Sequence, residues 1–176
     1  QKQRILEKNI PIIIQGSGVF TKKFTEGKQK KIYDLIFHSR IIKDKGIFEI
    51  IDALKILRNK NINLKTLIIG DPDDKNRSSV TLNQLDLWVK ENFIIWKPKV
   101  ENVIPLLQKS KISILPSYRE GLPKGLLEAA SCKLPLISTN VPGCREICKN
   151  NFNGFLVKPK DSKSLAKSIE RLVFDE

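Results

Sequence analysis

The chain has 176 residues, of which 40% are hydrophobic and 29% are charged, and its formal net charge is +13. This length is enough for one domain with a substantial core, and no apolar run approaches the roughly 20 residues that cross a bilayer. The N-terminus, QKQRILEKN, lacks the apolar segment of a signal peptide. A charge of this size implies an acidic partner, and nucleotide phosphates, an anionic membrane surface and nucleic acid all remain open.

Three cysteines, Cys132, Cys144 and Cys148, have no paired spacing, and the one histidine, His38, lies far from them in sequence. This pattern favours free thiols in a reducing cytoplasm over disulfides or a zinc site. The chain contains no methionine, so we expect it to be a fragment or a processed product.

Short apolar runs alternate with segments of helical periodicity along the chain. The expected strands span residues 10–14, 32–37, 64–69, 93–96, 112–115, 134–138 and 155–157. The expected helices span residues 46–58, 79–92 and 103–109, a segment that opens at 123, a segment that contains 145 and 146, and a last one through 172. This alternation predicts an α/β fold with a doubly wound, Rossmann-like parallel sheet. Right-handed crossovers would bring the loops of Arg40, Lys99, Glu120 and Gly143 to one rim.

Local signals refine some of these elements. Ser79 is expected to be the N-cap of the helix over residues 79–92. The apolar residues of this helix recur at helical spacing, and four of them are expected to face the core. These are Leu82, Leu85, Trp88 and Val89.

Loops and helix ends are marked by other signals. Residues 21–31 are rich in lysine without an apolar period and predict a solvated loop. Lys133 lies just beyond a helix and must either adopt a left-handed turn, at a cost of about 1 kcal/mol, or reshape that turn. Asp161 or Ser162 should cap the last helix. The acidic turn at residues 70–74 lacks the ordered spacing of a calcium loop.

The stretch at residues 112–128 combines a buried strand, a polar loop and a helix. Pro123 is favoured at the first helical position, which would make Leu122 the N-cap. Leucine has no side-chain acceptor, so the amides of Lys124 and Gly125 are left free at the positive end of a helix. This arrangement predicts a seat for an anion such as a diphosphate.

Two carboxylates bracket this seat, Glu120 in the loop and Glu128 eight positions later in the second helical turn. A carboxylate beside an anion site costs energy unless it binds something else, and sugar hydroxyls are good donors. Phosphate together with hydroxyls suggests a nucleotide sugar. The alternative, in which Glu120 offsets the helix dipole and Glu128 is solvated, remains open at this point.

The segment PSYREGLPKGLLEAA, followed by Pro135 and STNVPGCREI, resembles the C-terminal half of retaining glycosyltransferases of the GT-B fold, in glycosyltransferase family 4. The resemblance extends from the GSGV at residues 16–19 to the NGFLVKPKD at residues 153–161. It implies that residues 1–176 form the nucleotide-sugar-binding domain, with residues 1–15 as the crossover from an N-terminal acceptor-binding domain that this chain lacks.

The resemblance also implies roles for particular residues. Arg40 and Lys45 would grip the donor diphosphate, Glu120 would hold sugar hydroxyls against the acceptor, and Glu128 would bind the ribose. Further donor contacts are expected from Lys99 and Val100 at the base, and from Gly16, Gly121, Leu122, Pro123 and Lys124. No metal and no cofactor besides the nucleotide sugar, expected to be a UDP-sugar, is implied.

The GDPD turn at residues 70–73 and the SYREGLP segment at residues 117–123 resemble one subgroup of this family. Its enzymes extend bacterial capsule, lipopolysaccharide or lipid-linked oligosaccharide precursors on the cytoplasmic side of the membrane. The resemblance thus predicts a hexosyltransferase that is cytoplasmic or peripheral to the inner face of the membrane, with little activity in this part alone. Alternatives are a UDP-sugar epimerase or a phosphorylase of similar scaffold, a glycosidase that uses the two glutamates, and a basic nucleic-acid-binding module. The last would need exposed aromatic residues among the lysines.

Overall fold

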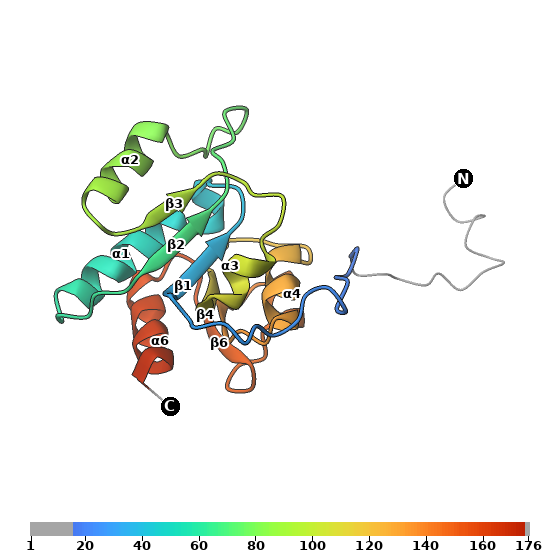
Figure 1. Ribbon diagram of the computed structural model, residues 1–176. Coiled ribbons are helices and arrows are strands. Elements are labelled where there is room, and N and C mark those ends of the chain that lie inside the picture. Colours follow the sequence, from blue (N-terminus) through green and yellow to red (C-terminus); the bar gives the residue numbers. More distant parts are fainter. Residues whose placement is uncertain (1–15, 175–176) are drawn as a thin grey trace.

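The computed structural model describes residues 16–174 and contains one six-stranded parallel sheet in the order β3-β2-β1-β4-β5-β6 (Figure 1). Its strands are β1 (Tyr33–His38), β2 (Thr66–Ile69), β3 (Ile95–Lys97), β4 (Ser110–Leu115), β5 (Leu136–Thr139) and β6 (Gly154–Val157). The predicted α/β class, the parallel sheet and six of the seven expected strands are confirmed. The expected strand at residues 10–14 and the crossover at 1–15 lie outside the described residues.

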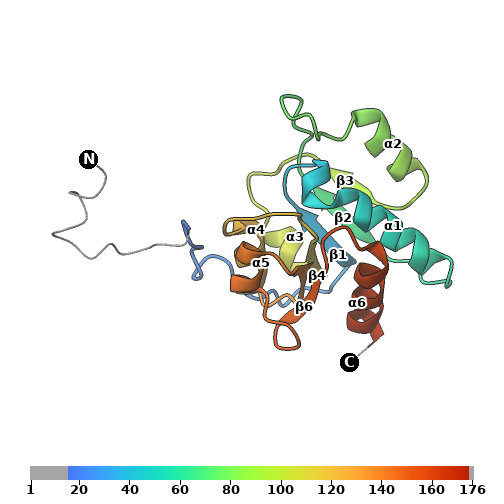
Figure 2. The same ribbon diagram turned by 180° about the vertical axis from the view of Figure 1, so that it is seen from behind.

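The helices connect these strands and cover both faces of the sheet. They are α1 (Ile47–Arg58), preceded by the short 3-10 helix η2 (Lys43–Lys45), then α2 (Leu82–Lys90), α3 (Ile104–Gln108), α4 (Lys124–Ser131), α5 (Pro142–Ile147) and α6 (Ser162–Phe174). Helices α1 and α6 pack together on the face seen in Figure 2, whereas α3 and α4 lie toward the viewer in Figure 1. Within residues 16–174, no helix has the length and apolar character needed to cross a bilayer.

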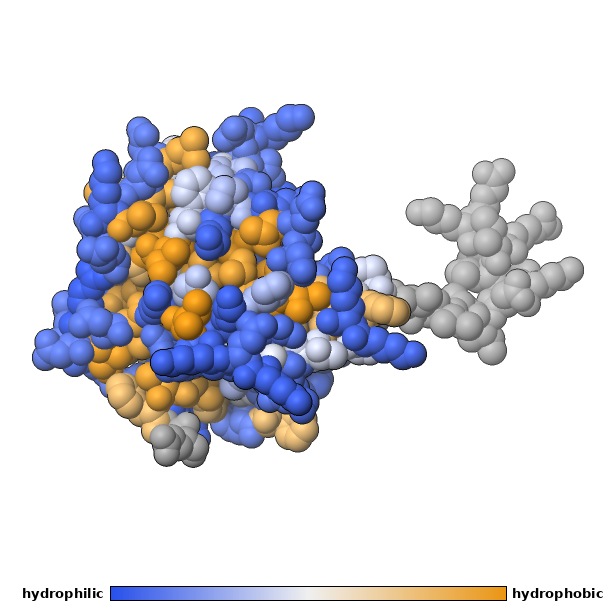
Figure 3. All heavy atoms as spheres, viewed as in Figure 1, coloured by the Kyte–Doolittle hydropathy of each residue, from blue (hydrophilic) through white to orange (hydrophobic). Residues whose placement is uncertain are grey.

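The core lies between the sheet and the helices on each side. The central strand β1 is an apolar run in which Leu35, Ile36 and Phe37 are all fully buried, as expected for a strand covered on both faces. Helix α1 buries a stripe at helical spacing, which consists of Ile47, Ile50, Ile51, Leu54 and Leu57. Most charged side chains lie on the surface, and Figure 3 shows hydrophilic residues around the margin of one face.

The N-cap of α2 differs from its prediction. The cap is Thr81, whose hydroxyl accepts a hydrogen bond from the Gln84 amide, while the Ser79 hydroxyl accepts one from the Asp73 amide. Because Ser79 is used within the preceding loop, the helix begins later. Asp161, by contrast, caps α6 as predicted by accepting from the Ser164 amide.

The buried face of α2 is narrower than predicted. Leu85 and Trp88 are buried, but Leu82 and Val89 are exposed. Helix α2 packs on the edge strand β3, so only one narrow face of the helix is covered. On that face the Trp88 ring meets Phe48 edge to face, with 5.4 Å between centroids.

All three cysteines are free and buried. Burial raises the pKa of each thiol, to about 12 for Cys148, where the neighbouring Cys144 adds to the effect. Because the thiolate is the reactive form, we expect iodoacetamide at pH 8 to modify none of them in the folded protein and all three after unfolding. Mass spectrometry of both samples checks this, and rapid labelling of the folded protein would contradict it.

Candidate functional site

The sheet order places a crevice at the carboxyl ends of β1 and β4. These two strands are neighbours, and the chain leaves β1 toward β2 but leaves β4 in the opposite direction, toward β5. Ligands of doubly wound sheets bind where the connections diverge in this way. The segment after β1 begins with Ser39 and Arg40, and the segment after β4 contains Glu120.

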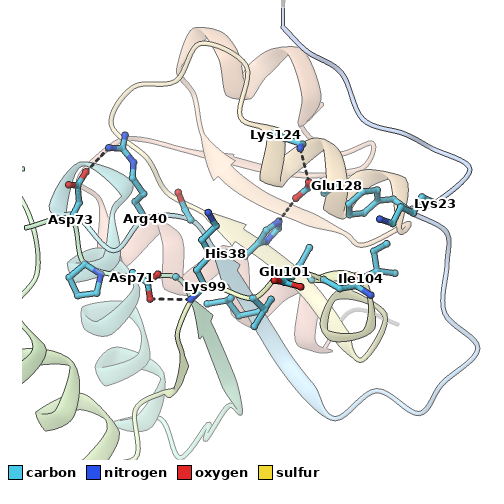
Figure 4. A pocket seen from close by; sticks show the side chains of 18 of the residues that line it. Lys23, His38, Arg40, Asp71, Asp73, Lys99, Glu101, Ile104, Lys124 and Glu128 are labelled. Carbon is cyan, nitrogen blue, oxygen red and sulfur yellow. Dashed lines mark hydrogen bonds and ion pairs between the residues drawn. The ribbon is translucent and has the colours of Figure 1, made fainter.

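Two adjoining cavities in this crevice are lined in part by α4. The larger, of about 910 Å³, extends from His38 to the loops after β2 and β3, and Figure 4 shows its lining. The smaller, of about 320 Å³, is lined by Lys45, Glu120 and the start of α4. The two share four lining residues: His38, Ser39, Lys124 and Glu128.

Helix α4 begins one residue later than predicted, because Pro123 has an extended conformation and is itself the N-cap. The N-cap nonetheless lacks a side-chain acceptor in the described part of the chain, as the sequence predicted. Within residues 16–174, no side chain accepts a hydrogen bond at this N-cap, while the Pro123 carbonyl is used by the amides of Leu126 and Leu127. Lys124 and Gly125 line the smaller cavity, so the positive end of α4 faces space that an anion could fill.

Glu128 lies where the two cavities meet, with only 13% of its side chain exposed. Its Oε2 is 3.3 Å from His38 Nε2, and its Oε1 is 3.7 Å from Lys124 Nζ. Gly125 permits the close approach of α4 to β1, because a Cβ there would lie 3.0 Å from both His38 Nε2 and the His38 carbonyl oxygen. His38 therefore orients Glu128, a role that the sequence analysis missed although its position at the end of a strand was recognisable.

Glu120 forms an ion pair with Lys45, whose Nζ lies 2.5 Å from Glu120 Oε1. Both side chains are largely buried, 16% exposed for Lys45 and 10% for Glu120. The pair joins the two loops that diverge from β1 and β4, and the second carboxylate oxygen has no hydrogen-bond partner among residues 16–174. That oxygen is chemically suited to accept from a hydroxyl.

The loop that contains Glu120 is held from three sides. Ser117 Oγ and the Tyr118 amide both donate to the Asp44 carbonyl, at 3.0 and 2.8 Å. The Tyr118 hydroxyl donates to Glu49 on α1 at 2.7 Å. The pKa of Tyr118 is raised, mainly by burial and secondly by this hydrogen bond. Thr139 of β5 donates to the Ser117 carbonyl. These contacts fix the position of the loop.

The acidic turn after β2 contacts two residues of the predicted site. Arg40 pairs with Asp73, 2.7 Å apart, and its side chain remains 61% exposed. The Lys99 amide donates to Asp71 at 3.1 Å, so this amide already has an acceptor within the protein. Lys99 and Val100 do line the larger cavity, and Figure 4 shows Lys99 on the far side of it from Lys124.

The segment before β1 also reaches the site. Gly16 packs against Leu122, since a Cβ on Gly16 would lie 2.7 Å from Leu122 Cδ2. The prediction of a solvated loop at residues 21–31 is correct for most of its lysines but wrong for Phe24, which packs against the core and lines the larger cavity with Lys23. Gly143 contacts the Glu120 loop from α5, so the loops predicted to share one rim do so.

The sequence profile of the glycosyl transferases group 1 family matches residues 19–176. The chain belongs to this family. A capsular polysaccharide biosynthesis glycosyltransferase, CapM of Staphylococcus aureus, is 35% identical over 137 residues, which are 78% of this chain and 36% of the relative. The UDP-Gal:alpha-D-GlcNAc-diphosphoundecaprenol alpha-1,3-galactosyltransferase of Escherichia coli is 28% identical over 97% of this chain and 43% of its own length. The chain thus spans less than half of either relative.

Solved structures of other glycosyltransferases have the same fold. The pneumococcal O-GlcNAc transferase GtfA, in complex with UDP and GlcNAc, superposes with a TM-score of 0.73 at 22% identity, over 85% of this chain and 31% of that one. A glycosyltransferase from Rickettsia africae gives 0.75 at 23% identity, over 98% and 50%. The predicted GT-B relationship is confirmed, and the epimerase and nucleic-acid alternatives find no support in these comparisons.

Proposed function

We propose that this chain is the donor-binding half of a retaining glycosyltransferase that uses a nucleotide sugar, most simply a UDP-sugar. The observation that supports this best is the start of α4, which has no side-chain cap and faces a cavity between Glu120 and Glu128. An anion seat between two carboxylates fits a diphosphate whose two ends both bear hydroxyl groups. Support also comes from the names of relatives, one of which specifies a UDP-galactose donor.

We infer the following placement of the donor. The nucleoside occupies the larger cavity, with its ribose hydroxyls on Glu128 and its base toward Lys99 and Val100. The diphosphate lies against the amides at the start of α4, near Gly121, Leu122, Pro123 and Lys124. The sugar hydroxyls bind the open oxygen of Glu120.

The chemistry that follows is stabilisation of the leaving group. When the bond from the anomeric carbon to the diphosphate breaks, negative charge increases on the diphosphate, and Lys45, Arg40 and the α4 amides stabilise it. Arg40 is exposed and paired only with Asp73 among the described residues, so it can turn toward a phosphate. Glu120 holds the sugar so that its anomeric carbon faces the acceptor.

The acceptor belongs to another part of the protein in this proposal. A hexose or N-acetylhexosamine would be transferred to a polysaccharide or lipid-linked precursor bound mainly by an N-terminal domain. The net charge of +13 suits a location at the anionic inner face of a membrane. The present chain should bind the donor with little or no turnover, and the absence of metal and nucleic acid from its function remains a prediction.

Isothermal titration of the chain with UDP, GDP, ADP and a short DNA duplex tests the proposal. At about 150 mM salt, binding through charge alone is partly screened. We expect saturable binding that favours UDP. Tighter binding of the duplex than of every nucleotide would contradict the proposal.

The cations of the site provide a second prediction. The double substitution Arg40→Ala and Lys45→Ala should weaken the binding of UDP by about 100-fold, because two charge-assisted contacts of roughly 1.5 kcal/mol each are lost. The affinity for uridine, which has no phosphate, should stay almost unchanged. Titration calorimetry measures both. The matched control, Lys90→Ala with Lys167→Ala, removes the same charge from α2 and α6. Equal losses for UDP and uridine would mean that these cations do not bind phosphate.

A further inference from the structure

The segment at residues 20–26 forms one wall of the larger cavity although it belongs to no strand or helix. Phe24 and Lys23 both line the cavity, on the side formed by α3 and α4. Figure 4 shows Lys23 on the side of Glu128 and Ile104, opposite Asp71 and Asp73. The cavity is therefore completed by a part of the chain outside the sheet and its helices.

Three consecutive residues attach this segment to the domain. Ser131 Oγ of α4 donates to the Phe24 carbonyl at 2.6 Å, and Gln108 Nε2 of α3 donates to the Thr25 carbonyl at 2.9 Å. Glu26 pairs with Lys133 at 2.7 Å. Helices α4 and α3 thus hold the backbone at Phe24 and Thr25, and the Phe24 side chain packs against the core.

Phe24 differs from the other aromatic residue of the segment. Phe20, four positions earlier, is 68% exposed and does not line the cavity, whereas Phe24 is partly buried against the core. The Phe20 carbonyl accepts hydrogen bonds from the amides of Lys23 and Phe24, so a turn separates the two rings. The turn directs one aromatic ring to solvent and the other to the site.

The cavity that Phe24 lines offers, on its facing walls, the groups that a nucleoside requires. The same cavity is lined by the apolar side chains of Val100, Val103 and Ile104 and by the carboxylate of Glu128. A nucleoside presents a flat π face and two adjacent hydroxyls, which require an apolar wall and an acceptor. We propose that Phe24 contacts the nucleoside of the donor and is a determinant of nucleotide affinity, an inference that rests on the proposed function.

The test compares Phe24→Leu and Phe20→Leu in the same chain, with UDP and inorganic pyrophosphate as probes. Leucine keeps the apolar packing of Phe24 but removes the ring. We expect Phe24→Leu to weaken the binding of UDP about tenfold. The affinity for pyrophosphate should stay the same, because pyrophosphate has no nucleoside. Phe20→Leu should change neither affinity, and Phe24→Tyr, which restores a ring, should bind UDP nearly as well as the unaltered chain.

The possible outcomes distinguish a failure of this inference from a failure of the proposed donor-binding function. If the unaltered chain does not bind UDP, the proposed function fails. If it binds UDP and Phe24→Leu binds equally well, the inference alone is wrong. If Phe24→Leu weakens the binding of UDP and of pyrophosphate to the same extent, the residue acts through the fold of the site and not by contact with the nucleoside. That result would also overturn the inference.

Discussion

Replacing Glu128 by alanine should weaken the binding of UDP about 30-fold. In the proposed site its carboxylate accepts from two ribose hydroxyls, and hydrogen bonds to a charged group contribute about 1.5 kcal/mol each or more. The two bonds together contribute about 3 kcal/mol, and relief of the repulsion between the carboxylate and the diphosphate returns about 1 kcal/mol, so the net loss of about 2 kcal/mol corresponds to that factor. Simple Coulomb attraction predicts the opposite sign, since Glu128 lies 3.7 Å from Lys124 and its removal makes the site more positive. The sign of the change therefore distinguishes a ribose ligand from a neighbouring carboxylate.

Pyrophosphate and a distant carboxylate supply the controls for Glu128. Pyrophosphate has no ribose, so the same substitution should leave its affinity unchanged or increase it. Glu170→Ala removes an equal charge from α6, where the residue pairs with Lys60 on the surface, and should change neither ligand. UDP affinity that stays the same or rises in Glu128→Ala, measured by calorimetry, would remove the ribose assignment.

The order of elements could be predicted from the sequence because its signals are local. Pro116 ends an apolar strand, and Pro123 lies beside the first turn of a helix, so the loop with Glu120 and the helix with Glu128 were placed to within a residue. Local signals compete at α2, where both Ser79 and Thr81 are good caps. The choice depends on the contact of Ser79 with the Asp73 amide, which only the folded loop provides.

The contacts made by His38 and Phe24 could not be predicted in this way. His38 meets Glu128 across 90 positions of sequence, and this requires β1 and β4 to be neighbours, a pairing that alternation of strands and helices does not specify. Phe24 lies in a lysine-rich segment without periodicity, and its place depends on anchors at Gln108, Ser131 and Lys133. Both are tertiary contacts, whereas sequence patterns report mainly which residues face inward from their own element.

Gly143→Ala should destabilise the protein by about 3 kcal/mol, which corresponds to a fall in Tm of about 10 °C for a chain of this size. A Cβ at position 143 would lie 1.9 Å from the Gly121 carbonyl oxygen and 2.7 Å from that of Glu120. One effect favours alanine: it has less backbone freedom to lose on folding, which contributes about 0.4 to 1 kcal/mol and also underlies its higher helix propensity. This gain cannot offset a backbone overlap that forces α5 away from the Glu120 loop.

Gly121→Ala is the matched substitution on the other side of this contact. A Cβ at Gly121 would meet nothing within 4 Å, so the same chemical change should alter stability by less than about 1 kcal/mol. Thermal unfolding of both variants tests the difference, and equal Tm values would show that α5 can move without cost. If α5 instead remains in place, the loop must shift, and Gly143→Ala should then also reduce the preference for a UDP-sugar over UDP, because Glu120 no longer faces the sugar.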